Sequence, residues 1–167
     1  MKNCYKLINK CIEWMLVAIF ALLVLDVLIQ VGSRYILGQS FSFTEELARF
    51  ALIWLSILGA AYLTGKNEHL YMDFLFVKLD VKKKIWFTKV TQILIAVFSI
   101  VVLVIGGANL SYITLVLGQL SPALGVPIAY VYMIVPFSGL LILFYSIYNF
   151  IYADEIANIA HSKIETI

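Results

Sequence analysis

Charged residues are scarce in this sequence. Only 13% of its 167 residues are Asp, Glu, Lys or Arg, whereas a soluble domain has about 25%. Hydrophobic residues make up 63%, and the mean hydropathy is +0.98. So little polar surface cannot coat a water-facing globule, which excludes an ordinary soluble domain. Lipid can solvate an apolar exterior, so the composition predicts an integral membrane protein with several spans.

Cysteine and histidine are also rare, with two residues each. Cys4 and Cys11 lie seven residues apart, where they share a helix face but cannot bridge, so we expect reduced thiols. A metal site needs more ligands close by. The sequence has no nucleophile elbow, zinc-protease motif or phosphate-binding loop. We therefore expect no catalytic residues, no metal and no cofactor. The net charge of +2 is small, and with the lysines gathered near the membrane it predicts no nucleic-acid partner.

Four apolar runs are long enough to cross a bilayer as helices, which takes about 20 residues each. The spans that we expect lie at about 12–33, 44–64, 85–108 and 128–153. The first run follows a basic segment but lacks a small-residue cleavage site, so we interpret it as a retained helix. The polar linker 65–88 has apolar residues at helical spacing, which predicts a short interfacial helix. Pro136 should kink the last span or mark its first turns. The prediction is an all-α integral membrane protein with one membrane domain, 1–167.

The distribution of basic residues predicts the orientation of the chain. All lysines fall on the side of the two termini, whereas Arg34 and Arg49 lie on the other side. The positive-inside rule therefore places both termini and the 65–88 linker in the cytoplasm. The segments 42–49 and 121–127 should then face outward together.

The segment 42–49 is the densest charge cluster between two apolar runs. Glu45 and Glu46 lie where the second span begins, and acidic residues suit the positive end of a helix. Arg49 lies within one turn of both and shares their face, and Arg34 closes the first span at the same interface. We weigh two interpretations: the charges only stabilise the helix end, or they also dock a partner.

Several other features have alternative interpretations. Asp26 lies inside the first span, where a carboxylate is costly. It is either a buried partner for a polar side chain of another helix or subunit, or an ion-coupling residue. His69 and Asp73, one turn apart, suit a metal or proton relay, but a simple hydrogen bond or a solvated surface is the interpretation that we favour. The loop 121–127, rich in Gly and Pro, is a plain turn or a partner contact. Gly59 lies in a small-residue patch where another helix can approach closely.

Several short motifs occur along nearly the whole chain, in a recognisable order. They are Gln30-Val31-Gly32-Ser33-Arg34-Tyr35, Thr44-Glu45-Glu46-Leu47-Ala48-Arg49, Trp54, Leu58-Gly59-Ala60-Ala61, Glu68-His69, Asp73, Ser121-Pro122-Ala123-Leu124-Gly125-Val126-Pro127, Tyr132 and Pro136. This order resembles the small membrane subunit, Q-type or DctQ-like, of tripartite ATP-independent periplasmic (TRAP) transporters. Many members of that family have Trp two residues before the Glu pair, where this chain has Phe43.

The resemblance implies a scaffold subunit that pairs one-to-one with a large membrane subunit. The large subunit binds substrate and sodium and moves as an elevator, and a periplasmic substrate-binding protein docks on the outer face. The implied cargo is an organic acid, such as sialic acid or a C4-dicarboxylate, and the implied location is the bacterial inner membrane, with lipid as a further partner. The residues that we expect to serve structure or partner contact are Arg34, Tyr35, Glu45, Glu46, Arg49, Gly59, His69, Asp73, Ser121, Pro122, Gly125 and Pro127.

A second hypothesis is a self-sufficient four-helix antiporter. It would act as a proton-coupled homodimer around Asp26, a residue that the resemblance does not explain. This hypothesis predicts that Asp26→Asn abolishes proton-coupled efflux, whereas a scaffold subunit would transport nothing alone. The sequence does not identify the solute.

Overall fold

The chain is described by a computed structural model that covers residues 2–38, 41–66 and 81–153. Its helices in chain order are α1 (Lys2–Leu37), α2 (Ser42–Lys66), α4 (Val81–Phe98), the π-helix η1 (Ser99–Gly106), α5 (Gly107–Val116), α6 (Ile128–Tyr132) and α7 (Ile134–Ile151). Within the described ranges the only extended pairing is an isolated bridge between Leu120 and Pro127. The short helix predicted in the linker, with His69 and Asp73, lies outside the described residues.

Within the described residues, four helical segments are long and apolar enough to cross a membrane. They are Tyr5–Ile36, Ser42–Lys66, Ile85–Val116 and Ile128–Ile151. The predicted all-α fold with four spans is therefore confirmed. The first three spans extend past the predicted bounds, whereas the fourth ends at Ile151, two residues before its predicted end.

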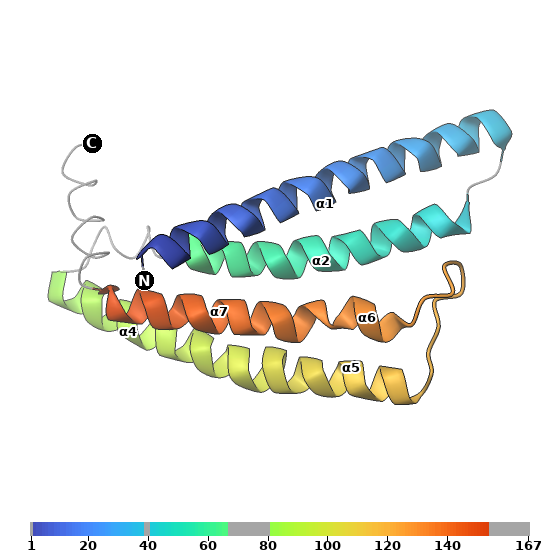
Figure 1. Cartoon of the computed structure of the whole chain (residues 1–167). Helices are drawn as coiled ribbons and strands as arrows, with labels where there is room; N and C mark the ends of the chain where they lie inside the picture. Colours follow the sequence, from blue (N-terminus) through green and yellow to red (C-terminus); the bar gives the residue numbers. More distant parts are fainter. Residues whose placement is uncertain (1, 39–40, 67–80, 154–167) are drawn as a thin grey trace, which may run out of the picture.

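The spans lie side by side in a row (Figure 1). α1 packs on α2, α2 packs on α7, and α7 packs on the third span, which consists of α4, η1 and α5. The N-terminal end of α1 lies at the same end of the row as the C-terminal end of α7, as four antiparallel crossings require. Toward the other end, α1 diverges from α2 (Figure 1). As an outer member of the row, α1 has little of its surface covered by the rest of the chain.

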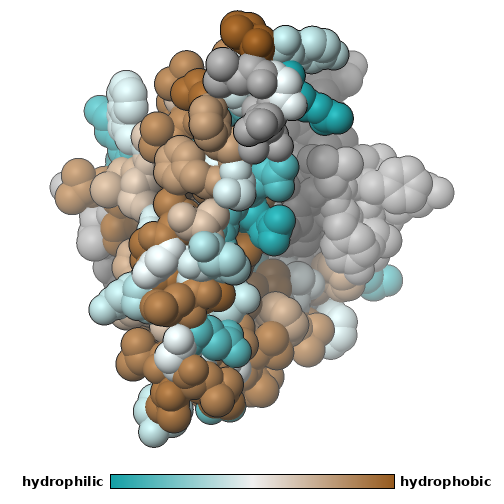
Figure 2. Space-filling view, turned by 90° about the vertical axis from the view of Figure 1, so that its right-hand side faces the viewer, coloured by the Kyte–Doolittle hydropathy of each residue, from teal (hydrophilic) through white to brown (hydrophobic). Residues whose placement is uncertain are grey.

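Apolar side chains remain exposed on the outer helices. On α1, Trp14 is 67% exposed and Leu28 is 62% exposed, and Leu94 on α4 is 65% exposed. Figure 2 looks onto the end where α1 and α2 diverge, and apolar side chains cover much of its visible surface. Such surfaces are stable in contact with lipid or with another membrane protein, because neither exposes them to water.

The centre of the row is α7, where close packing depends on small residues. A Cβ atom added at Gly139 would lie 2.8 Å from the Leu103 side chain, and one added at Gly107 would lie 2.8 Å from Val135. The Ser99 hydroxyl donates a 2.6 Å hydrogen bond to the carbonyl oxygen of Gly139. Glycine on both helices therefore lets η1 and α5 approach α7 closely, as is common between membrane helices.

Two of the four spans are irregular. The third span contains the eight-residue π-helix η1 against α7, a form that usually occurs only as a short bulge. The fourth span is interrupted at Met133, three residues before Pro136. The ring of a proline clashes with the carbonyl group four residues earlier and so prevents regular helix geometry there. The break at Met133 therefore agrees with the effect expected of Pro136.

Candidate functional site

Glu46, near the start of α2, contacts the loop that joins α5 to α6. Its Oε2 atom accepts hydrogen bonds from the backbone N–H groups of Ala123 at 2.9 Å and Leu124 at 3.2 Å. The Ser121 hydroxyl oxygen also accepts from the N–H of Leu124, at 3.2 Å. A carboxylate that accepts from several donors forms stronger bonds than a neutral acceptor would. Glu46 therefore joins the second span to the connection between the third and fourth spans.

The loop is closed by its own hydrogen bonds. The N–H of Gly125 donates to the carbonyl of Ser121 at 2.8 Å, and the N–H of Ser121 donates to the carbonyl of Val126 at 2.9 Å. Gly125 has φ +65°, a left-handed conformation that glycine adopts without steric cost. Ser121 is buried, while Pro122 is exposed at the surface. The sequence indicated either a plain turn or a contact loop, and the structure shows a tight turn held by Glu46.

The start of α2 is fixed beside this loop. The Thr44 hydroxyl donates a 2.7 Å hydrogen bond to the carbonyl of Phe41, and Thr44 is buried. The neighbouring side chains of Phe41 and Phe43 are about half exposed, at 51% and 48%. The same end of the molecule therefore combines a fixed backbone with exposed aromatic side chains, which is a composition common at protein interfaces.

The basic residues of this end lie at its surface. Arg34 and Tyr35 are exposed near the C-terminal end of α1, where they line a shallow groove together with Val31. Arg49 is exposed on α2. Within residues 2–38, 41–66 and 81–153, neither arginine forms an ion pair with a carboxylate. Glu46 therefore accepts hydrogen bonds from the loop, while both arginines lie at the exposed surface.

Asp26 lies on the side of α1 that packs against α2. Only 5% of the residue is exposed, and its Oδ2 atom has no hydrogen-bond partner in the part of the chain that the structure describes. Buried carboxyl groups in membrane helices usually have a specific polar partner or a functional reason. Both interpretations of Asp26 therefore stay open.

A second cluster ties three spans together at the opposite end of the row. The Tyr5 hydroxyl donates to the carbonyl oxygen of Gly65, and the Tyr145 hydroxyl donates to Oδ1 of Asn9 at 2.7 Å. Tyr5 also stacks on Tyr148, with ring centroids 4.4 Å apart. These contacts join α1, α2 and α7. Sequence reasoning did not identify this cluster, because tyrosine at helix ends is also typical of the membrane interface.

Gly59 and Gly65 have different surroundings. A Cβ atom added at Gly65 would lie 3.0 Å from Asn9 and from the Tyr145 ring, whereas one added at Gly59 would meet nothing within 4 Å. Within the described chain, the close helix approach on α2 is therefore at Gly65. The open surface at Gly59 leaves room for a neighbouring molecule.

The described residues contain no group of three His, Cys, Asp or Glu side chains that could hold a metal ion. Their contacts are those of a fixed helical frame: Glu46 on the loop, the tyrosine cluster at the other end, and Trp54 between them. The Trp54 Nε1–H donates a 3.1 Å hydrogen bond to the carbonyl of Val131, which joins α2 directly to the fourth span. This arrangement can support neighbouring proteins at fixed positions.

Comparison with known proteins identifies the family of this chain. Residues 12–155 match the family described as "Tripartite ATP-independent periplasmic transporters, DctQ component". A putative TRAP transporter small permease protein of Haemophilus influenzae is 35% identical over 79 residues, which are 47% of this chain and 49% of the relative. The sialic acid TRAP transporter small permease protein SiaQ of Vibrio cholerae is 26% identical over 106 residues, 64% of this chain and 61% of the relative.

A further relative is a larger protein. The sialic acid TRAP transporter permease protein SiaT of Haemophilus influenzae is 34% identical over 74 residues, which are 42% of this chain but only 11% of the relative. Each of the three alignments thus spans less than two thirds of the relative's own length. The family match covers most of the chain, and four helices are long enough to cross a membrane. The chain is a multi-pass membrane protein that belongs to the DctQ component family of tripartite ATP-independent periplasmic transporters.

Proposed function

We propose that this chain is the scaffold subunit of a sodium-coupled TRAP transporter that takes up an organic acid. In this role it braces a large membrane subunit, which carries the substrate and sodium sites and moves against it. The observation that carries the proposal is the hydrogen bonding of Glu46 to Ala123 and Leu124. It fixes one end of the row, while the tyrosine cluster fixes the other.

A scaffold must be stiffer than the element that moves against it. Ties at both ends of α2 and α7 oppose sliding of one span past the other, because sliding would break several hydrogen bonds together. The exposed apolar surfaces of the outer helices provide the area for a large partner. The open surface at Gly59 suits the close approach of a partner helix.

The end of the molecule that carries Glu46 supports the second part of the proposal, docking of a substrate-binding protein. If the lysine-rich side is cytoplasmic, as the positive-inside rule indicates, this end is periplasmic and both termini are cytoplasmic. Exposed Arg34, Arg49 and Tyr35, with the fixed loop 121–127, then form the surface that the binding protein meets. Charged groups on such a surface mainly raise the association rate.

The solute that we propose is an organic acid. Two relatives have sialic acid in their names, which supports a carboxylate solute for this chain. We assign substrate binding to the partners, as the resemblance implies. A C4-dicarboxylate fits the same arrangement.

Copurification tests the assembly directly. The tagged full-length chain is expressed together with the large membrane protein of its own transport system, extracted in mild detergent and purified by the tag. We expect a one-to-one complex that survives gel filtration. A stable homodimer that excludes the large protein would contradict the proposal.

The second candidate is the proton-coupled homodimer around Asp26. The specific observation in its favour is the burial of Asp26 without a hydrogen-bond partner for Oδ2 among the described residues. It requires proton-driven efflux by the chain alone, with loss of that efflux in Asp26→Asn. Vesicles that contain only this chain and show no proton-linked flux would eliminate it.

A further inference from the structure

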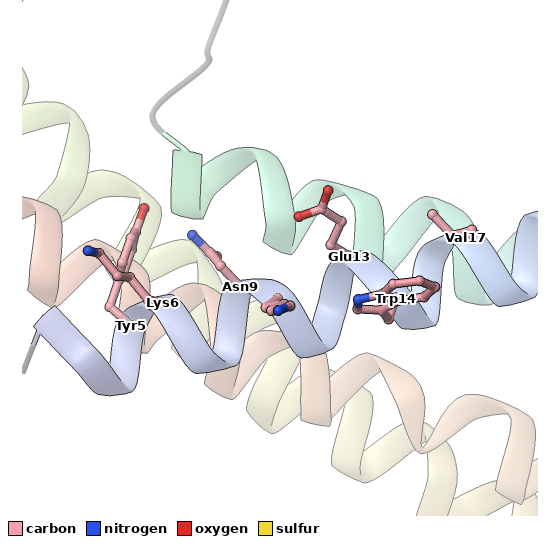
Figure 3. A pocket seen from close by; sticks show the side chains of 7 residues that line it. Tyr5, Lys6, Asn9, Glu13, Trp14 and Val17 are labelled. Carbon is pink, nitrogen blue, oxygen red and sulfur yellow. The ribbon is translucent and has the colours of Figure 1, made fainter.

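The N-terminal part of α1 forms a groove that neither the scaffold role nor the docking role uses. Figure 3 shows the side chains along it. The groove has a volume of about 560 Å³ and is lined by one helix alone, through Tyr5, Lys6, Asn9, Lys10, Glu13, Trp14 and Val17. This volume lies within the usual range of small-molecule sites, about 300–1,000 Å³.

The chemistry of the groove changes along its length. Lys6 and Lys10 lie toward the N-terminal end of the groove, and Trp14 and Val17 lie further along α1, nearer the middle of the span Tyr5–Ile36. With a rise of about 1.5 Å per residue, the distance from Lys6 to Val17 is roughly 16 Å. A phospholipid has the same order of groups over a similar length, with a phosphate at the surface and hydrocarbon below.

One wall of the groove is held in place by neighbouring helices. Asn9 accepts the hydrogen bond of Tyr145 at 2.7 Å, and Tyr5 stacks on Tyr148 at 4.4 Å. These partners belong to α7, so the backbone that carries the lysines is fixed before any ligand binds. Pre-organisation of this kind lowers the entropic cost of binding.

The charges of the groove favour an anionic ligand. Two lysines and one glutamate, Glu13, line it, so its net charge is positive. Glu13 lies one turn deeper than Lys10, below the level that a phosphate would occupy beside the lysines. The ammonium group of a zwitterionic lipid extends outward from its phosphate, away from Glu13. Each lysine near a membrane surface adds attraction for anionic lipid.

We propose that this groove binds an anionic phospholipid, with the phosphate between Lys6 and Lys10 and an acyl chain along Trp14 and Val17. Trp14 is 67% exposed, and an exposed indole at this depth suits the boundary between head groups and hydrocarbon. The inference is independent of the proposed function and of which side of the membrane this end faces.

Quenching of tryptophan fluorescence by brominated lipid tests the proposal. The full-length chain carries Trp86→Phe, because Trp86 is also 67% exposed, and is reconstituted in phosphatidylcholine vesicles. Brominated phosphatidylglycerol or brominated phosphatidylcholine is added in equal amounts. We expect brominated phosphatidylglycerol to quench Trp14, the remaining exposed indole, with an apparent affinity about threefold higher, or more, than that of brominated phosphatidylcholine.

Charge variants distinguish lipid binding in the groove from general attraction of anionic lipid to the charged surface. Lys6→Gln with Lys10→Gln should remove the preference, and Glu13→Gln should increase it. The matched control, Lys66→Gln with Lys83→Gln, removes the same charge at the same end outside the groove and should keep the preference. Circular dichroism verifies that each variant remains helical.

Three outcomes would overturn the proposal. Equal quenching by both lipids in the parent chain would show that the groove does not select anionic lipid. A control that loses as much preference as the Lys6 and Lys10 variant would show general surface attraction only. Absence of quenching by either lipid would show that protein, such as a second copy of the chain, covers the groove.

Discussion

Oε2 of Glu46 lies 2.9 Å from the backbone nitrogen of Ala123, a residue 77 positions further along the chain. The contact joins the start of the second span to the connection between the third and fourth. The same oxygen also accepts a hydrogen bond from the backbone N–H of Leu124, so one side chain binds two backbone donors. A change at Glu46 should therefore affect the loop more than the helix that carries it.

Glu46→Gln should loosen the loop 121–127. The amide keeps the shape of the side chain but loses the charge that strengthens the bonds to Ala123 and Leu124. We expect the amides of these two residues to exchange hydrogen about tenfold faster, measured by mass spectrometry on the full-length protein in detergent micelles. Glu45→Gln removes the same charge one residue away and is the control. Unchanged exchange at Ala123 and Leu124 in Glu46→Gln would show that the carboxylate does not hold the loop.

Gly65→Ala should destabilise the protein, because the added methyl group would lie 3.0 Å from Asn9 and Tyr145. Crowding of this kind typically costs about 1–3 kcal/mol. Gly59→Ala is the matched control on the same helix, where nothing lies within 4 Å, and better helix propensity should leave stability unchanged or slightly higher. Thermal unfolding in detergent measures both. Equal melting temperatures for the two variants would contradict the packing described at Gly65.

Tyr145→Phe should remove the hydrogen bond to Asn9 and leave the packing of the ring in place. The loss of one buried hydrogen bond costs about 1 kcal/mol, so thermal unfolding should shift to a lower temperature. Tyr112→Phe, at an exposed site on α5, provides a comparison without that cost. If both variants unfold at the same temperature, the tie between α1 and α7 contributes nothing measurable.

Asp26→Asn separates the two candidate functions. The amide is nearly isosteric with the carboxyl, so a scaffold should keep its assembly with the large subunit and its contribution to uptake. A homodimeric antiporter should lose proton-coupled flux completely in the same variant. The readouts are the yield of the purified complex and solute uptake by the reconstituted system. Intact assembly with abolished uptake would assign a coupling role to Asp26 and count against a purely supporting subunit.

The spans were predictable because hydrophobic length and the scarcity of charge report directly on the bilayer. Their order in the row was not predictable, since helices that are apolar on all sides carry no periodic signal of which face contacts which neighbour. The break near Pro136 followed from the covalent geometry of proline. The π-helix η1 had no corresponding signal, because its sequence is a plain run of apolar residues.

The candidate site was predictable in part. The charge cluster at Glu45, Glu46 and Arg49 marked the end of the molecule where Glu46 contacts the loop, but the sequence paired Glu46 with Arg49 as helix neighbours. Its hydrogen-bond partners are backbone amides far along the chain, which a residue pattern cannot reveal. Likewise, the small-residue patch drew attention to Gly59, whereas the crowded glycine is Gly65, because small side chains do not show which face is buried.

The most direct test of the account is solute uptake by proteoliposomes of defined composition. Radiolabelled sialic acid, and a C4-dicarboxylate in parallel, is offered under an inward sodium gradient. The vesicles contain this chain alone, the large subunit alone, or both, each with and without the substrate-binding protein. For a scaffold subunit, we expect sodium-dependent uptake only when all three proteins are present. Uptake by vesicles that contain this chain alone would contradict it.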